Sequence, residues 1–182
     1  MNLPFFRTAL APSYSFSYNG TPMVDTLGFH EGTLVYEGKD YPGLQLNLDA
    51  VEQHVLVQLP YSPVVLDVGQ ESIESFSRGN AIYVNLGRMG LKVQPGFYEQ
   101  MALGKGGLYR KINKSLKHLS TLEVSAERLI GYEDPHYRRL VTDYFEYSEV
   151  WYLVREDGSV RRLRNKRQIQ NAYQYVQTHE TN

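Results

Sequence analysis

The chain has 182 residues, enough for one ordinary domain with a hydrophobic core that needs no metal ion or disulfide. It contains no cysteine, which excludes disulfides, zinc–thiolate sites and cysteine nucleophiles. Nineteen basic and twenty acidic side chains nearly cancel, so nucleic acid is not an expected partner, and any anionic partner would need a local basic patch. Fifteen tyrosines and seven phenylalanines favour a sheet protein.

The first twelve residues, 1–12, are expected to form an N-terminal arm. Pro4 and Arg7 interrupt its short apolar run, which leaves it too brief and too broken for a signal peptide or a membrane span. The chain as written shows no leader and no transmembrane segment, and it is expected to be soluble.

A hairpin is the clearest local feature. Thr33 to Glu37 is rich in β-forming residues, and Gly38 supplies the positive φ angle that a tight turn needs. The chain then returns through Leu44, Leu46 and Leu48, which alternate with polar residues. This period of two predicts a strand with one buried face and one wet face.

Similar alternation and turn signals recur along most of the chain. Together with the hairpin they predict strands near residues 13–18, 33–37, 44–48, 55–59, 64–68, 73–76, 81–86, 97–103, 108–114, 140–147, 150–155 and 160–164. The segment 87–96 holds three glycines and a proline, and it predicts either a loop or a bulged strand.

Two segments break the period of two and predict helices. Ser120 and Glu123 match a capping box ahead of a short helix that ends near Gly131. Asn165 and Gln168 form the same arrangement before an apolar stripe at i, i+3, i+4 and i+7, which predicts an amphipathic helix over 165–177.

The expected fold is therefore mainly β, on the border between all-β and α+β. We predict a single domain over 1–182, built from one antiparallel, strongly curved sheet or incomplete barrel of eight or more strands. The 165–177 helix should pack on this sheet. A two-sheet β-sandwich is the alternative.

No catalytic motif is present: the sequence lacks hydrolase, metalloprotease, phosphate-loop and dinucleotide signatures. We predict no catalytic residues, no metal site and no cofactor. His136 is the one histidine near carboxylates, Glu133 and Asp134, and the spacing is more typical of a surface loop than of a metal site. Carboxylates also cluster, and a carbohydrate-active hydrolase would have to use them. They are Glu71 and Glu74, and Asp143, Glu146 and Glu149.

Two groups of residues are candidates for binding. Aromatic side chains near the C-terminus could face a sugar or an apolar ligand, or could form core and cross-strand pairs. These ligand-facing candidates are Tyr144, Phe145, Tyr147, Trp151 and Tyr152. A basic run precedes and opens the last predicted helix, where cations oppose the helix dipole, so it could bind an anion or form a solvated turn. These anion-binding candidates are Arg161, Arg162, Arg164, Lys166 and Arg167.

Several segments together resemble a known group of proteins. They are residues 32–41 and 44–49, Pro95 to Tyr98, Arg110 to Leu116, and Trp151 to Val154 with Asp157-Gly158 ahead of a basic helix. In this order they resemble uncharacterised exported proteins of Bacteroidetes, over about residues 18 to 176. The chain departs from the pattern between Leu116 and Leu140, where it is longer. The resemblance implies a periplasmic or cell-surface location and transfers no functional residue.

These observations favour a non-enzymatic protein of the cell envelope that binds a partner protein or an apolar small molecule on its curved sheet. One alternative is a carbohydrate-active hydrolase or sugar-binding module that uses the clustered carboxylates and aromatics. Another is a structural or assembly subunit.

Overall fold

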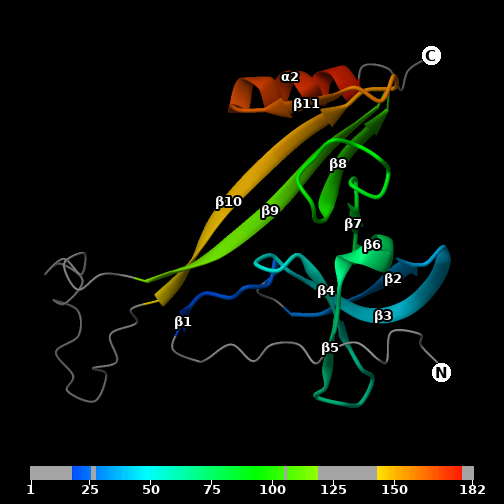
Figure 1. Ribbon diagram of the computed structural model, residues 1–182, viewed down its shortest axis with the longest axis vertical. Helices are drawn as coiled ribbons and strands as arrows, with labels where there is room; N and C mark the ends of the chain where they lie inside the picture. The colour runs from blue at the N-terminus through cyan, green and yellow to red at the C-terminus, as the bar shows by residue number, and fades with distance from the viewer. Residues whose placement is uncertain (1–17, 26–27, 105, 119–142, 178–182) are drawn as a thin grey trace, which may run out of the picture.

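The computed structural model describes residues 18–25, 28–104, 106–118 and 143–177 (Figure 1). Within these ranges the chain forms one eleven-stranded sheet, one short 3-10 helix, η2 (Gln70–Ser72), and one α-helix, α2 (Lys166–Gln177). The strands are β1 (Tyr18–Asn19), β2 (His30–Tyr36), β3 (Lys39–Asp49), β4 (His54–Gln58), β5 (Val65–Val68), β6 (Ile73–Arg78), β7 (Ala81–Val84), β8 (Tyr98–Gly104), β9 (Gly106–His118), β10 (Asp143–Val154) and β11 (Val160–Leu163).

The sheet is open. Its strands follow the order β1-β10-β9-β8-β7-β6-β2-β3-β4-β5, and β11 also pairs with β10. Neighbouring strands are antiparallel, except that β1 runs parallel to β10. The path does not close into a barrel. The prediction of a mainly β fold, with one antiparallel curved sheet or incomplete barrel and a C-terminal helix packed on it, is confirmed. The described strands form one sheet rather than the two of a sandwich.

The first hairpin has the predicted form. Glu37 and Gly38 both have positive φ angles, 48° and 71°, as a two-residue type I′ turn requires. Leu44, Leu46 and Leu48 of β3 are buried in a core formed by β2 to β7. The leucine face is therefore the inner face of this half of the sheet.

The opposite face of β3 is more buried than the alternation of apolar and polar residues predicts. Asn47 is fully buried, and its Nδ2 donates to the carbonyl oxygens of Asp25 at 3.2 Å and Gly28 at 2.8 Å. The segment after β1 covers this position, and it is tied to the end of β3 by a bridge between Met23 and Asp49. The local pattern gives no sign of this cover because the covering segment is distant along the chain.

A long hairpin arm dominates the other half of the molecule (Figure 1). Residues 107–118 of β9 pair without a break with residues 143–154 of β10. The prediction of separate strands at 140–147 and 150–155 is therefore wrong: one continuous strand runs through residues 148 and 149. The unbroken partner β9 supplies backbone hydrogen bonds through the polar stretch that looked like an interruption.

The β8–β9–β10 part of the sheet is packed on both faces. On one face, which we call the helix face, Leu108 and Leu153 pack under α2 together with its buried Ala172 and Val176. On the opposite face, which we call the far face, Tyr109 and Tyr152 join a second cluster with Tyr98, Leu86 and Val150. Successive residues of β9 and β10 thus alternate between two separate cores.

Helix α2 begins as predicted. Asn165 caps it, because the Asn165 side chain accepts a hydrogen bond from the Gln168 N–H at 2.9 Å. The Gln168 side chain accepts from the Arg164 N–H at 2.8 Å, one residue before the expected partner of a capping box. The predicted helix over 165–177 is confirmed. Across the described ranges, no helix has the length and apolar character that crossing a bilayer requires.

Some predictions fall outside the described residues. These are the arm at 1–12, most of the first strand at 13–18, the short helix at 120–131 and the cluster of Glu133, Asp134 and His136.

Candidate functional site

The outer edge of β10 is paired at both ends and not between them. β1 pairs with Asp143 and Tyr144, and β11 pairs with residues 151–154. Among the residues that the structure describes, no strand pairs with residues 146–150 on this edge, which we call the open edge. Glu146, Tyr147, Ser148 and Glu149 are all exposed there. An edge of this kind presents unpaired backbone N–H and C=O groups to its surroundings.

Beside the open edge, on the helix face, one arginine joins three strands. The guanidinium of Arg110 on β9 bonds to Glu99 on β8, with Nη2 2.5 Å from Oε2, and to Glu149 on β10, with Nη1 3.2 Å from Oε1. In the register of the sheet Arg110 lies opposite both Glu99 and Trp151. The arginine is therefore held between two carboxylates from neighbouring strands.

Alternate residues of β10 complete the cluster, because positions 147, 149 and 151 share a face. The Trp151 Nε1–H donates to Glu149 Oε2 at 2.8 Å, and the Tyr147 hydroxyl donates to Glu149 Oε1. The Arg110 guanidinium also lies over the Trp151 ring, 5.7 Å from its centroid. We call Glu99, Arg110, Tyr147, Glu149 and Trp151 the Glu149 network.

The network fixes the ionisation of its members. Partial burial acts to raise the pKa of Glu149, but hydrogen bonds from Tyr147 and Trp151 and the charge of Arg110 outweigh it, so this pKa is lowered from 4.5. Burial, followed by the hydrogen bond to Glu149 and the charge of Glu149, raises the pKa of Tyr147 to about 12. At neutral pH Glu149 is thus an anion and Tyr147 a neutral donor.

The three carboxylates that suggested hydrolysis are not brought together. Glu146 lies on the face opposite Glu149 and pairs with Lys117 at 3.5 Å. Asp143 is six residues before Glu149 on the same strand, about 20 Å away at ~3.3 Å per residue. A glycosidase needs two carboxyl groups within about 5–10 Å, one of them protonated, whereas Glu149 is held ionised.

The second acidic pair, Glu71 and Glu74, is tied into the structure by one arginine. The Arg88 guanidinium lies 3.2 Å from Glu74 Oε1 and also donates to the backbone oxygen of Glu71. Glu74 further accepts from the Gly38 N–H at 3.3 Å. These contacts join η2 and β6 to neighbouring turns, which is a structural role.

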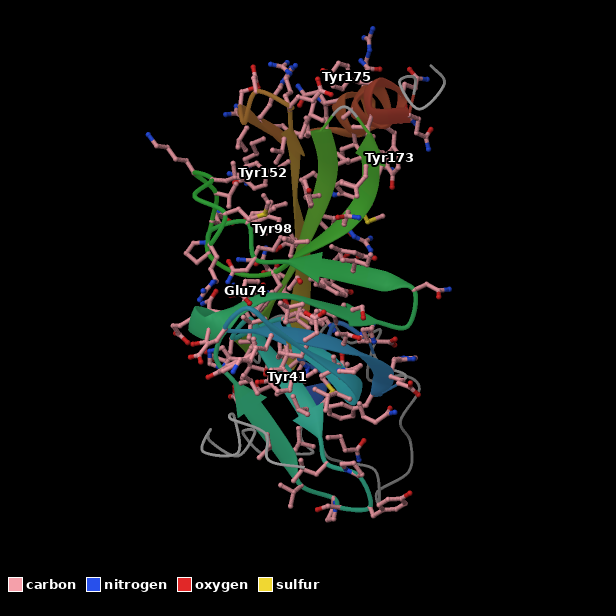
Figure 2. All side chains as sticks on the ribbon, turned by 90° about the vertical axis from the view of Figure 1, so that its right-hand side faces the viewer. Tyr41, Glu74, Tyr98, Tyr152, Tyr173 and Tyr175 are labelled. Atoms are coloured by element: carbon pink, nitrogen blue, oxygen red, sulfur yellow. The ribbon has the colours of Figure 1, made fainter. Side chains whose placement is uncertain are left out.

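The five ligand-facing candidates are divided between the two faces of β10. Tyr144 and Tyr152 lie on the far face, and Tyr152 is buried in an edge-to-face contact with Tyr98, with ring centroids 5.7 Å apart (Figure 2). Phe145, Tyr147 and Trp151 lie on the helix face. Tyr147 is the most exposed of the five, with 51% of its surface accessible. A ligand on the helix face would therefore meet Tyr147 first.

The five anion-binding candidates are all exposed, and they surround one end of the molecule. Arg161 and Arg162 lie opposite Leu153 and Tyr152, so their side chains leave β11 on opposite faces. The charge of Arg162 acts on the Tyr98 hydroxyl of the far-face cluster. Lys166 and Arg167 lie in the first turn of α2. Arg162 is therefore separated from the other four.

One buried lysine, Lys111, and one half-buried lysine, Lys114, were not singled out from the sequence. Lys111 Nζ donates to the carbonyl oxygen of Pro95, and Lys114 Nζ donates to those of Thr21 at 2.8 Å and Met23 at 2.6 Å. Burial lowers the pKa of both lysines. They tie loops to β9. Strand alternation could have placed Lys114 beside Arg110 and Ile112, but it does not show which loop covers them.

Side-chain contacts between separate segments were also missed. Asp25 Oδ2 lies 2.8 Å from Arg78 Nη1 and 3.0 Å from His30 Nε2, while His54 Nδ1 lies 2.8 Å from Asp67 Oδ1. Within the described part of the chain, no group of three or more histidine or acidic side chains is placed to hold a metal ion. No family model, curated protein or solved structure matches this chain.

Proposed function

We propose that this chain is a non-enzymatic binding protein of the cell envelope, and that it binds a partner protein along the open edge of β10. The observation that carries the proposal is the gap at 146–150 between two paired stretches of the same edge. An extended segment of about five residues would fill this gap by adding backbone hydrogen bonds to the sheet.

The surroundings of the gap support a protein partner. β1 and β11 fix both ends of the edge, so the unpaired stretch is held in an extended conformation before a partner arrives. Tyr147 offers a large exposed aromatic surface beside it, and its hydroxyl is anchored by Glu149. A rigid edge next to an aromatic anchor is the usual form of a site for strand addition.

The envelope location rests on the resemblance to exported proteins of Bacteroidetes, whose motifs fall on β2, β3, β9 and β10. Fractionation of the native host followed by immunoblotting tests it. The chain is expected in the periplasmic or surface fraction, and recovery in the cytoplasm would refute this part of the proposal.

The alternatives predict different occupants of the same surface. A second copy of the chain on the open edge would make it an assembly subunit, and a glycan stacked on Tyr147 would make it a sugar-binding module. Hydrolysis is disfavoured because Asp143, Glu146 and Glu149 do not converge.

The experiment is site-specific photo-crosslinking in native cells. A benzoylphenylalanine at Ser148, within the open edge, is expected to give one discrete protein adduct. The Tyr147→Ala substitution should remove that adduct, whereas Tyr61→Ala should keep it, because Tyr61 is fully exposed on the connection between β4 and β5.

Each other result contradicts the proposal. An adduct of the chain with itself would favour the assembly subunit, and loss of all protein adducts together with binding in a glycan screen would favour the sugar-binding module. An adduct that survives Tyr147→Ala would show that the aromatic anchor has no part in binding.

A further inference from the structure

Among the described residues, the arginines differ in whether they form ion pairs, and the difference follows their place in the fold. Arg78, Arg88 and Arg110, in the body of the sheet, each pair with a carboxylate at 2.5 to 3.2 Å. Arg161, Arg164 and Arg167, near the start of α2, form no ion pair with any described residue, and neither does Lys166. We call these last four residues the basic end. The molecule is nearly neutral as a whole, yet four cations without an ion pair lie close together here.

The basic end faces outward. Arg161 belongs to β11, Arg164 to the connection, and Lys166 and Arg167 to the first turn of α2, and all four are exposed. Arg167 lies five residues before the buried Ala172, which places it about 140° around the helix axis from the packed side. Arg161 and Arg164 are separated by about 10 Å of extended chain. Four cations thus lie within one or two Debye lengths, about 8 Å each, of one another.

The arrangement is unfavourable for the isolated molecule. Like charges at this spacing repel, and the cations at the start of α2 also face the positive end of its dipole. The capping contacts of Asn165 and Gln168 do not offset this cost, because they involve backbone groups and not the cationic side chains. A negatively charged surface outside the molecule would offset it.

Exposed apolar side chains lie toward the C-terminal end of α2, whereas the cations lie at and before its start. Tyr175 of α2 lies at the extremity of the molecule in Figure 2, and it is 39% exposed. Leu103, at the end of β8 where α2 finishes, is 49% exposed. Cations together with an exposed tyrosine and leucine are typical of surfaces that rest on a lipid headgroup layer, where charges meet phosphates and apolar groups enter the boundary.

We propose that the basic end and α2 dock this protein on the surface of an anionic lipid membrane. Arg161, Arg164, Lys166 and Arg167 contact the headgroup phosphates, and Leu103 and Tyr175 reach the interface. Docking here is independent of the partner site, because the open edge of β10 and the headgroup contacts use different residues. The protein would be held at the membrane while residues 146–150 remain accessible.

Vesicle co-sedimentation of the full chain tests this proposal. The chain is expected to sediment with vesicles of phosphatidylcholine mixed with phosphatidylglycerol and not with phosphatidylcholine alone, and salt should weaken the binding. The triple variant R161Q/R164Q/R167Q should bind on the order of 100-fold more weakly, since each cation near an anionic membrane contributes about fivefold.

A matched control removes the same charge elsewhere. The variant K39Q/K92Q/K117Q also loses three exposed cations and should bind within about twofold of the parent. Equal weakening by the two variants would show that net charge alone drives binding. Leu103→Ser should reduce the binding that persists in high salt. Binding to heparin or a nucleic acid without binding to anionic vesicles would overturn the proposal, as would equal sedimentation with both kinds of vesicle.

Discussion

Glu149 accepts hydrogen bonds from Tyr147, Trp151 and Arg110, and this one carboxylate decides the ionisation of the surface beside the open edge. Each donor favours the anion, and the anion in turn disfavours the phenolate of Tyr147. The surface therefore presents a fixed negative charge and a neutral tyrosine across the physiological pH range.

The titration of Tyr147 tests directly how Glu149 affects its ionisation. Glu149→Gln removes the charge and alters the hydrogen bond, so the pKa of Tyr147 should fall from about 12 toward 10. Ring-carbon NMR of labelled tyrosine, assigned with Tyr147→Phe, measures it. Glu146→Gln, on the opposite face, should leave the titration in place. An unchanged pKa in the Glu149 variant would mean that burial alone sets it.

Buried tyrosines also make stability sensitive to alkali. Burial, then the neighbouring Tyr152, raises the pKa of Tyr98 well above 10, so between pH 10 and that higher value the unfolded chain ionises and the folded chain does not. The stability that this tyrosine provides is complete below pH 10 and is lost as the pH rises. Burial lowers the pKa of Lys111 and Lys114, which acts in the opposite direction.

Tyr98→Phe is therefore expected to reduce the loss of stability at alkaline pH. The variant loses the hydrogen bond from the hydroxyl to Gln94, about 1 kcal/mol at neutral pH, yet its free energy of unfolding should fall less steeply above pH 10 than that of the parent. Urea unfolding at a series of pH values measures both quantities. If the free energy of unfolding fell equally steeply with pH in the parent and the variant, Tyr98 would not be a cause of the alkaline loss of stability.

How far the sequence specifies single residues depends on where their partners lie. Alternation along β10 separates Tyr147 and Trp151 from Tyr144 and Tyr152 without any coordinates. It cannot find Arg110 or Glu99, because the contacts of Arg110 with Glu99 and Glu149 depend on the register of three strands. It also misplaces Asn47, since the segment that buries this residue is distant in sequence.

At the scale of elements, α2 depends on its cap. The Asn165 side chain satisfies one of the free N–H groups of the first turn. Asn165→Ala should lower the free energy of unfolding by about 1 kcal/mol. Chemical denaturation measures this loss, and Gln170→Ala, at an exposed position within the helix, serves as the control. Equal effects of the two substitutions would show that the cap does not stabilise the helix.

The contact of α2 with β8 leaves no room for a side chain at Gly104. A Cβ there would lie 2.2 Å from the backbone oxygen of Val176. Gly104→Ala should therefore push the helix away from the sheet and cost about 1–3 kcal/mol. Gly87→Ala, whose Cβ would meet its nearest neighbour at 3.4 Å, should change stability by less than about 0.5 kcal/mol. Thermal unfolding compares the stability of the two variants. A Gly104→Ala variant as stable as the parent would show that α2 does not pack closely against β8.

Elements with local signals were predicted well. The hairpin of β2 and β3 has its glycine turn, and α2 has its cap and apolar stripe, so both follow from neighbouring residues. The polar pair Ser148 and Glu149 predicts an interruption within β10, and the structure has none. Its continuity comes from β9, a partner that pairs across a long intervening segment.

For the whole molecule, the sequence indicates a sheet but not its order. Consecutive strands from β2 to β5 and from β6 to β11 pair as a meander would. The pairings of β2 with β6 and of β1 with β10 join distant segments, and no local pattern encodes them. The open edge exists because β1 and β11 each cover only part of β10, so it could not be inferred before the strand order was known.

Residue-resolved amide hydrogen exchange tests the open edge most directly. Residues 151–154 lie between β9 and β11, so their amides should all be protected. Along 146–150, among the described strands, only β9 pairs with β10, so the amides that face β9 should exchange slowly and those between them fast, alternating from residue to residue. Uniform protection of 146–150, equal to that of 151–154, would show that the edge is covered and would contradict the binding mode proposed for this protein.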